Sequence, residues 1–266
     1  MPKTPPPDQC HRLSHETYVD ALAAETRRMA ATVAGADLTA TVPTCPEWDL
    51  GKLVRHVSRV HRWVNTLVKH GITEPTPRSE LPRPAAPERA EDYPAWLTSG
   101  AEELATVLRA ADPNAPVWNW STDHYVRFWS RRMLHETIVH RVDAELTVGI
   151  KPAVEPWWAV DTIDELFSNL AAARFGDTRR QFQGDGSVLA LAATDVDVHW
   201  RVHLHARDFT LGHAAPDAPA TSTLAGPAGE LALTVSRRRP LEPSARGCTL
   251  TGERAPWDSW LSTLAF

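Results

Sequence analysis

Apolar side chains recur at intervals of three and four residues through the first two thirds of the chain. This spacing gathers them on one face of an α-helix and predicts amphipathic helices. Ser14 and Asp49 stand just before two of these segments, where their side-chain oxygens can accept hydrogen bonds from first-turn N–H groups. Prolines and glycines separate the segments. Five helices are therefore expected, at residues 14–34, 49–69, 94–110, 126–148 and 156–175.

The second expected helix carries one polar residue that its pattern does not explain. Its apolar stripe consists of residues at helical spacing, namely Leu53, Val57, Val60, Val64 and Leu67. His56 lies three residues after Leu53 and four before Val60, so it points along the edge of this stripe and not into open solvent. His56 is therefore a candidate functional residue.

After Gly184 the hydrophobic period falls from about 3.6 residues to two. Residues 198–205 alternate apolar and polar side chains, as a strand with one buried face does. Together with residues 187–194 they predict an antiparallel pair, and the remaining pattern suggests a helix, a strand and a helix at 229–236, 249–251 and 257–264. The sequence thus predicts an α+β fold, with a helical bundle at residues 12–178 followed by a small α+β domain at residues 186–266.

The composition is that of a folded, soluble protein. The 266 residues are 42% hydrophobic and 23% charged, close to the usual globular mixture. The net charge of −5 is spread along the chain, so no basic patch favours a nucleic acid or an anionic membrane surface. The first residues lack the apolar core of a signal peptide, and no segment is apolar over the length of a bilayer. We therefore expect a cytoplasmic protein.

Three cysteines, Cys10, Cys45 and Cys248, stand at wide and irregular spacing. An odd number at such spacing fits reduced thiols better than a disulfide framework. Cys45 is bracketed by prolines, which favours a structural part in the turn before the second helix over a role as a nucleophile.

The fourth expected helix holds the densest group of metal-ligating side chains. Glu136 and His140 are one turn apart, about 40° around the axis, and share a face. His135 lies about 100° from Glu136 and 140° from His140, so it is not expected to join them. The two histidines are five residues apart, which excludes the zincin motif because that motif needs a spacing of four. With His56 from the second helix, Glu136 and His140 could form a three-ligand site that leaves a position for water or substrate.

Spacing alone leaves ordinary alternatives open. A glutamate and a histidine one turn apart often form only a solvated contact on a helix face. A histidine at an apolar edge is commonly a hydrogen-bonded core residue. His199, His203 and His205 are interpreted most simply as the polar face of a strand. The alternative, which is less favoured, is that they form a second metal site.

Two blocks of the chain are similar to a known family. Residues 42–48 have the sequence Val-Pro-Thr-Cys-Pro-Glu-Trp and are followed by Leu-Val-Arg-His at 53–56 and His-Arg-Trp at 61–63. The second block, at 132–144, has the sequence Arg-Met-Leu-His-Glu-Thr-Ile-Val-His-Arg-Val-Asp-Ala. In their order and rough separation, the blocks resemble the mycothiol-dependent maleylpyruvate isomerase family. A less specific similarity extends from Leu224 to Pro240.

The resemblance implies a DinB-like helical bundle that holds a divalent metal, typically zinc, through His56, Glu136 and His140. It also implies an arginine of the C-terminal domain near the substrate. Arg237 and Arg238 are the candidates, within a run of three arginines. Ser236 stands where the family pattern more often has glycine. The C-terminal domain is expected to be similar to sterol-carrier-like folds.

The expected function follows from the family and from metal chemistry. A thiol bound to a divalent cation ionises near neutral pH, because the cation stabilises the thiolate far more than the thiol. We therefore expect an enzyme that uses mycothiol as cosubstrate to attack a small electrophile, as an S-transferase or a cis–trans isomerase, with S-transfer favoured. The alternative is that the protein is not an enzyme but a metal-containing binding or regulatory module.

Overall fold

The computed structural model describes residues 13–76, 84–171, 182–241 and 246–264. The chain divides into two compact units, one spanning Leu13–Pro152 and the other formed mainly by Ala153–Phe266. The first unit is a bundle of four helices, and the second combines a five-stranded sheet with helices. This is the α+β class that the sequence predicts. No helix in the described ranges is long and apolar enough to cross a membrane.

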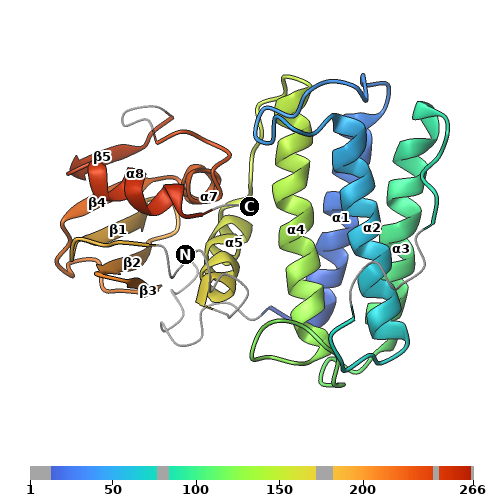
Figure 1. The fold of residues 1–266 in the computed structure, drawn as a ribbon, viewed down its shortest axis with the longest axis horizontal. Helices are drawn as coiled ribbons and strands as arrows, with labels where there is room; N and C mark the ends of the chain where they lie inside the picture. The colour runs from blue at the N-terminus through green and yellow to red at the C-terminus, as the bar shows by residue number, and fades with distance from the viewer. Residues whose placement is uncertain (1–12, 77–83, 172–181, 242–245, 265–266) are drawn as a thin grey trace. The chain divides into compact units, whose positions relative to one another are not determined.

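The bundle helices run side by side (Figure 1). They are α1 (His15–Val33), α2 (Leu50–Lys69), α3 (Tyr93–Ala110) and α4 (Val126–Thr147). Both expected N-caps form: Ser14 accepts from the backbone N–H of Thr17 at 3.1 Å, and Asp49 accepts from that of Lys52 at 2.5 Å. The predicted apolar stripe of α2 is buried along its whole length. Its burial fixes the face that α2 turns toward its neighbours.

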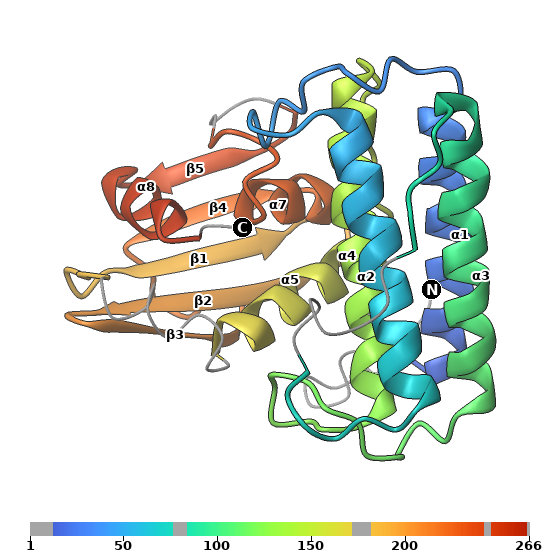
Figure 2. The ribbon, with the colours of Figure 1, turned by 45° about the vertical axis from the view of Figure 1, so that its right-hand side comes forward.

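The second unit contains a sheet in the order β3-β2-β1-β4-β5 (Figure 2). β1 pairs antiparallel with β2, as predicted, and parallel with β4, while β2–β3 and β4–β5 are antiparallel. The strands are β1 (Val188–Ala193), β2 (Val198–His205), β3 (Asp208–His213), β4 (Ser222–Gly226) and β5 (Thr249–Gly252). Three helices share one hydrophobic core with this sheet, namely α5 (Pro156–Ala171), α7 (Ala228–Val235) and α8 (Ala255–Ser262).

Helix α5 lies in a different unit from the one that the sequence pattern suggested. The predicted boundary at residue 178 grouped it with the bundle. In the structure, Ile163 and Phe167 of α5 are buried in the same core as Trp200 of β2, and the division between the units falls after Pro152. The hydrophobic period of α5 reveals a buried face but not the partner that covers it. The expected last turn, at 172–175, lies outside the described residues.

Strands β3 and β4 were not predicted. β4 contains a single large apolar residue, Leu224, among small and polar ones, and β3 alternates only Phe209 and Leu211 before a glycine. Such short patterns carry little period-two signal. β4 is nevertheless hydrogen-bonded on both sides within the sheet, so tertiary pairing decides its conformation.

Candidate metal centre

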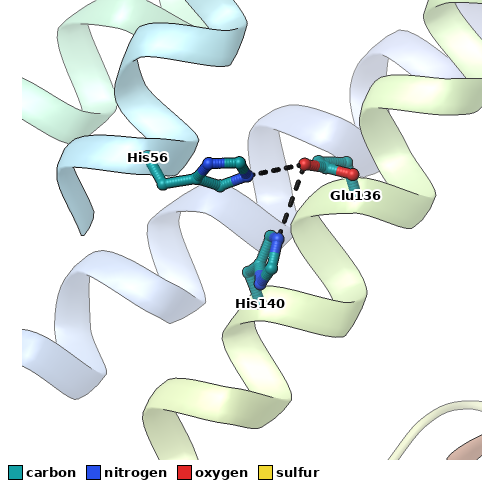
Figure 3. A group of neighbouring side chains, drawn as sticks. All are labelled: His56, Glu136 and His140. Carbon is teal, nitrogen blue, oxygen red and sulfur yellow. Dashed lines mark hydrogen bonds and ion pairs between the residues drawn. The ribbon is translucent and has the colours of Figure 1, made fainter. Parts of the chain in front are cut away.

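Helices α2 and α4 bring the three predicted ligands together. His56 lies in the second turn of α2, and Glu136 and His140 lie one turn apart on α4. Figure 3 shows the His56 and His140 rings converging on the Glu136 carboxylate from the two helices. Because Val57 and Val60 are fully buried, the face of α2 is fixed and His56 is held at its edge, toward α4.

Both imidazoles face the same carboxylate oxygen. Nε2 of His56 lies 2.9 Å from Oε1 of Glu136, and Nε2 of His140 lies 3.5 Å from the same atom. One ligand atom from each residue lies within 4.8 Å of the other two. The side chains of His56, Glu136 and His140 are 25%, 12% and 14% exposed. The group is therefore shielded on most sides yet reachable from solvent.

This donor set fits a divalent metal. Zinc binds imidazole nitrogen and carboxylate oxygen at about 2.0–2.2 Å, so two donors on one tetrahedral ion lie roughly 3.4 Å apart. The separations of 2.9 and 3.5 Å are close to that value. Two histidines and one glutamate are also a ligand set of catalytic zinc sites, which keep a fourth position open. Within the described ranges, no other group of three His, Cys, Asp or Glu residues converges in this way.

Glu136 is held in its ionised form. Burial raises the pKa of its carboxyl, but the nearby charge of Arg132 and hydrogen bonds from His140 and His56 outweigh burial and place the pKa well below its ordinary value. Arg132, one turn earlier on α4, forms an ion pair with Oε2. Oε1 thus remains directed at the two histidines, and the carboxylate is ready to act as a ligand without losing a proton.

His140 lies between two carboxylates. Its Nδ1 donates to Oδ2 of Asp143 at 2.9 Å, while its Nε2 faces Glu136. Burial lowers the pKa of His140, but the hydrogen bonds to Asp143 and Glu136 raise it to about 9. A metal that binds Nε2 must therefore displace a proton from this ring at neutral pH.

Two other histidines of the bundle face elsewhere. His135 is buried, and its ring packs edge-to-face against Tyr18 of α1 with 6.5 Å between centroids. His61 is also buried, and its Nε2 lies 2.9 Å from the hydroxyl of Thr137. Burial lowers the pKa of His61 to about 3, which keeps the ring neutral. Helical spacing correctly separated His135 from Glu136 and His140.

Asp143 and Trp48 border the site, and the sequence analysis assigned neither of them a role there. Asp143 follows His140 by three residues, a spacing that places both on one face of a helix and that could have revealed the contact. The Trp48 ring centroid lies 4.9 Å from that of His56 and 6.5 Å from that of His140. Trp48 comes from the turn before α2, and no periodicity predicts where such a turn places its side chains.

The histidines of β2 make pairwise contacts and do not converge on one point. His199 lies 3.1 Å from a carboxylate oxygen of Asp197, and His205 lies 3.2 Å from the hydroxyl of Thr210. The rings of His203 and His205 stack with 6.3 Å between centroids. This arrangement fits the simpler interpretation, the polar face of a strand.

Arg237 and Arg238 follow α7 and so belong to the other unit from the three candidate ligands. Arg237 donates to the carbonyl of Leu264 at 3.1 Å, and Arg238 donates to that of Ser236 at 2.7 Å. Arg237 has a φ of 62°, whereas Ser236 has a φ of −81°. The position whose backbone favours glycine is therefore 237 and not 236.

The described cysteines do not form a disulfide. Cys45 and Cys248 are free thiols, in agreement with the sequence, and Cys10 lies outside the described residues. Burial raises the pKa of the Cys248 thiol, which disfavours the reactive thiolate. The backbone N–H of Cys45 donates to the carbonyl of Val42 at 3.0 Å within a tight turn. This contact accords with a structural part for Cys45.

Comparisons with known proteins agree with both units. The family described as "Mycothiol maleylpyruvate isomerase N-terminal domain" matches residues 19–145, and the one described as "MDMPI C-terminal domain" matches residues 157–259. The crystal structure of the mycothiol-dependent maleylpyruvate isomerase aligns with a TM-score of 0.55 at 15% identity, over 92% of this chain and 96% of that one. A histidine-to-alanine variant of that isomerase aligns equally well, at 14% identity. No curated protein matches the sequence. At these identities the structural likeness shows a shared fold.

Proposed function

The chain belongs to the mycothiol maleylpyruvate isomerase family, and from this premise we propose an enzyme that uses the thiolate of mycothiol to attack a small electrophile. The observation that carries the proposal is the convergence of His56, Glu136 and His140 within 4.8 Å in the matched bundle. On this proposal the three residues hold a divalent metal, zinc, and the reaction takes place in the cytoplasm. Its partners are mycothiol and the electrophile.

The bound metal would supply the positive charge that stabilises the mycothiol thiolate over the thiol near neutral pH. The protein adds one negative charge to the ligand set, on Glu136, and that charge is already shared with Arg132. With a divalent cation bound, the carboxylates of Glu136 and Asp143 and the guanidinium of Arg132 would leave a net positive charge at the site, which favours an anionic sulfur ligand. The partial exposure of His56 gives the thiol a route to the site.

The family name supports isomerisation of a conjugated cis-alkene acid. The thiolate forms a C–S bond at the alkene, and the alkene electron pair moves into the conjugated carbonyl. The former double bond then rotates as a single bond, and return of the electron pair expels the thiolate and leaves the trans alkene. The thiol is regenerated. With an electrophile that carries a leaving group or an epoxide, the C–S bond forms as a carbon–heteroatom bond breaks, and mycothiol is consumed.

We assign the substrate-facing arginine to Arg238. The left-handed backbone at Arg237 marks the place where a family glycine fits, and the arginine that follows it is Arg238. A guanidinium binds a carboxylate through two parallel hydrogen bonds. Arg238 would in this way hold a carboxylate of the substrate, and it cannot act as a ligand for a cation.

The test is a thiol-dependent assay on metal-loaded protein, with the chelated protein as control. Maleylpyruvate and a panel of epoxides and alkyl halides are supplied with mycothiol, and both product and remaining thiol are measured. Trans product without thiol loss identifies an isomerase, and a conjugate formed with equal thiol loss identifies an S-transferase. Metal-loaded protein that turns over no electrophile would contradict the proposal and favour the binding-module alternative.

A further inference from the structure

A loop before α2 reaches across to the candidate metal site through one buried carboxylate. The hydroxyl of Thr44 donates to Oδ1 of Asp143 at 2.6 Å, and Oδ2 of Asp143 accepts from Nδ1 of His140 at 2.9 Å. Asp143 is only 1% exposed. We propose that Asp143 and Thr44 are positioning residues: Asp143 sets the tautomer and orientation of His140, and Thr44 sets the orientation of Asp143. This inference rests on the proposed metal site.

The role of Asp143 follows from the two nitrogens of an imidazole. A neutral ring carries one N–H and one lone pair, and a metal needs the lone pair. Asp143 accepts from Nδ1, so when the ring gives up one proton to a metal, the remaining proton stays on Nδ1 and the lone pair is on Nε2, the atom that faces Glu136. Without that acceptor, the His140 ring is free to take either tautomer and to turn about its side-chain bonds. Carboxylates in this place commonly tune metal affinity.

The role of Thr44 follows from the burial of Asp143. A buried carboxylate is costly unless its oxygens are hydrogen-bonded. His140 and Thr44 each donate to a different oxygen of Asp143, which fixes the rotation of the carboxylate plane. Loss of the Thr44 hydroxyl leaves Oδ1 without this donor and lets the plane turn away from His140.

The loop that carries Thr44 is itself tightly held. The backbone N–H of Val42 donates to the carbonyl of Trp48 at 2.9 Å, and that of Trp48 donates to the carbonyl of Cys45 at 2.8 Å. Val42 is fully buried, and Thr41 and Asp49 form an isolated β-bridge at the ends of the loop. The same loop also carries Trp48, whose ring packs on both histidines. The block at 42–48 therefore contacts the site at two points, and we infer that its shape serves ligand placement.

The experiment measures zinc affinity by chelator competition and the absorption spectrum of the Co²⁺-substituted protein. Asp143→Ala should weaken zinc binding by about 10–100-fold, the range typical of partners behind a metal ligand. Thr44→Val should weaken it less and alter the Co²⁺ spectrum, and Thr44→Ser should restore both. Thr147→Val is the matched control, because the Thr147 hydroxyl donates to the backbone carbonyl of Asp143 at 2.8 Å and not to its carboxylate. This variant should bind zinc as the unmodified protein does.

Asp143→Asn replaces Asp143→Ala in this experiment if the alanine variant does not fold, because the amide oxygen of asparagine retains one hydrogen-bond acceptor. We expect its zinc affinity to lie between that of Asp143→Ala and that of the unmodified protein. Unmodified zinc affinity and an unmodified Co²⁺ spectrum in both Thr44→Val and Asp143→Asn would overturn the inference while the proposed function stands. Failure of the unmodified protein to bind either metal would overturn the proposed function and the inference together.

Discussion

Two histidine-rich regions of this chain behave differently. In the bundle, His56 and His140 converge with Glu136, and one ligand atom from each lies within 4.8 Å of the others. On β2, His203 and His205 stack at 6.3 Å, and His205 also lies 3.2 Å from the hydroxyl of Thr210. The number of histidines is therefore a poor guide to a metal site. Convergence on a common point separates the two regions.

The difference lies in how a helix and a strand space their side chains. Residues four apart on a helix lie one above the other and can aim at one point. Residues two apart on a strand stand parallel, perpendicular to the sheet. The bundle adds a second helix that supplies His56, Arg132 forms an ion pair with Glu136, and Asp143 accepts a hydrogen bond from His140. In the described ranges, no group of three His, Cys, Asp or Glu residues that includes a histidine of β2 converges in this way.

Removal of one proposed metal ligand should have the largest effect on metal binding. His56→Ala or His140→Ala should reduce zinc affinity by more than the roughly 100-fold upper range of indirect partners, because each removes a direct donor. His203→Ala is the matched control and should keep the full metal content. Elemental analysis after dialysis measures both. Equal metal loss from the bundle and strand variants would erase the distinction between the two regions.

The second effect is the pH dependence of metal binding. The pKa of His140 is raised to about 9, so the ring is protonated below that pH and the metal must displace the proton. Apparent zinc affinity should therefore rise with pH, by about tenfold per unit between pH 7 and 9. Chelator competition across this range, corrected for the chelator's own protonation, provides the measurement. A flat profile would show that His140 is not a ligand.

The third prediction is that the arginines after α7 affect activity but not metal binding. Arg238→Ala should lower thiol-dependent kcat/KM by about 10–100-fold, the worth of a hydrogen bond to a charged group. Metal content should not change. Arg237→Gly is the control, because glycine tolerates the φ of 62° at that position, and it should retain activity. Full activity in Arg238→Ala would remove the assigned role.

The smallest effect on the metal site concerns His135. His135→Ala should retain the full metal content but lower the free energy of unfolding by about 1–3 kcal/mol, because a buried ring that packs on Tyr18 is removed. Thermal unfolding and metal analysis of the same preparation separate the two outcomes. Metal loss comparable to that of His140→Ala would show that the helix-face assignment on α4 is wrong.

The periodicity of the sequence correctly predicted features that depend on a single helix or on two adjacent strands. The caps Ser14 and Asp49, the buried stripe of α2 and the separation of His135 from Glu136 all follow from angles around a helix axis. The pairing of β1 with β2 likewise follows from alternation over adjacent segments.

Contacts between distant segments could not be predicted in this way. The burial of α5 against the sheet and the insertion of β4 between β1 and β5 depend on tertiary partners that no local pattern names. The bond from Thr44 to Asp143 joins residues 99 positions apart. Helical spacing indicated that Glu136 and His140 share a face, but only the fold shows His56 opposite them.

Calorimetric titration of mycothiol tests whether the bundle site holds a metal that in turn binds a thiolate. Zinc-loaded and metal-free protein are each titrated in two buffers of different ionisation enthalpy, which gives the protons released on binding. We predict tight binding to the loaded protein with release of about one proton per thiol, because the cation stabilises the thiolate. Comparable binding to the metal-free protein, or binding to the loaded protein without proton release, would show that no metal-bound thiolate forms at this site.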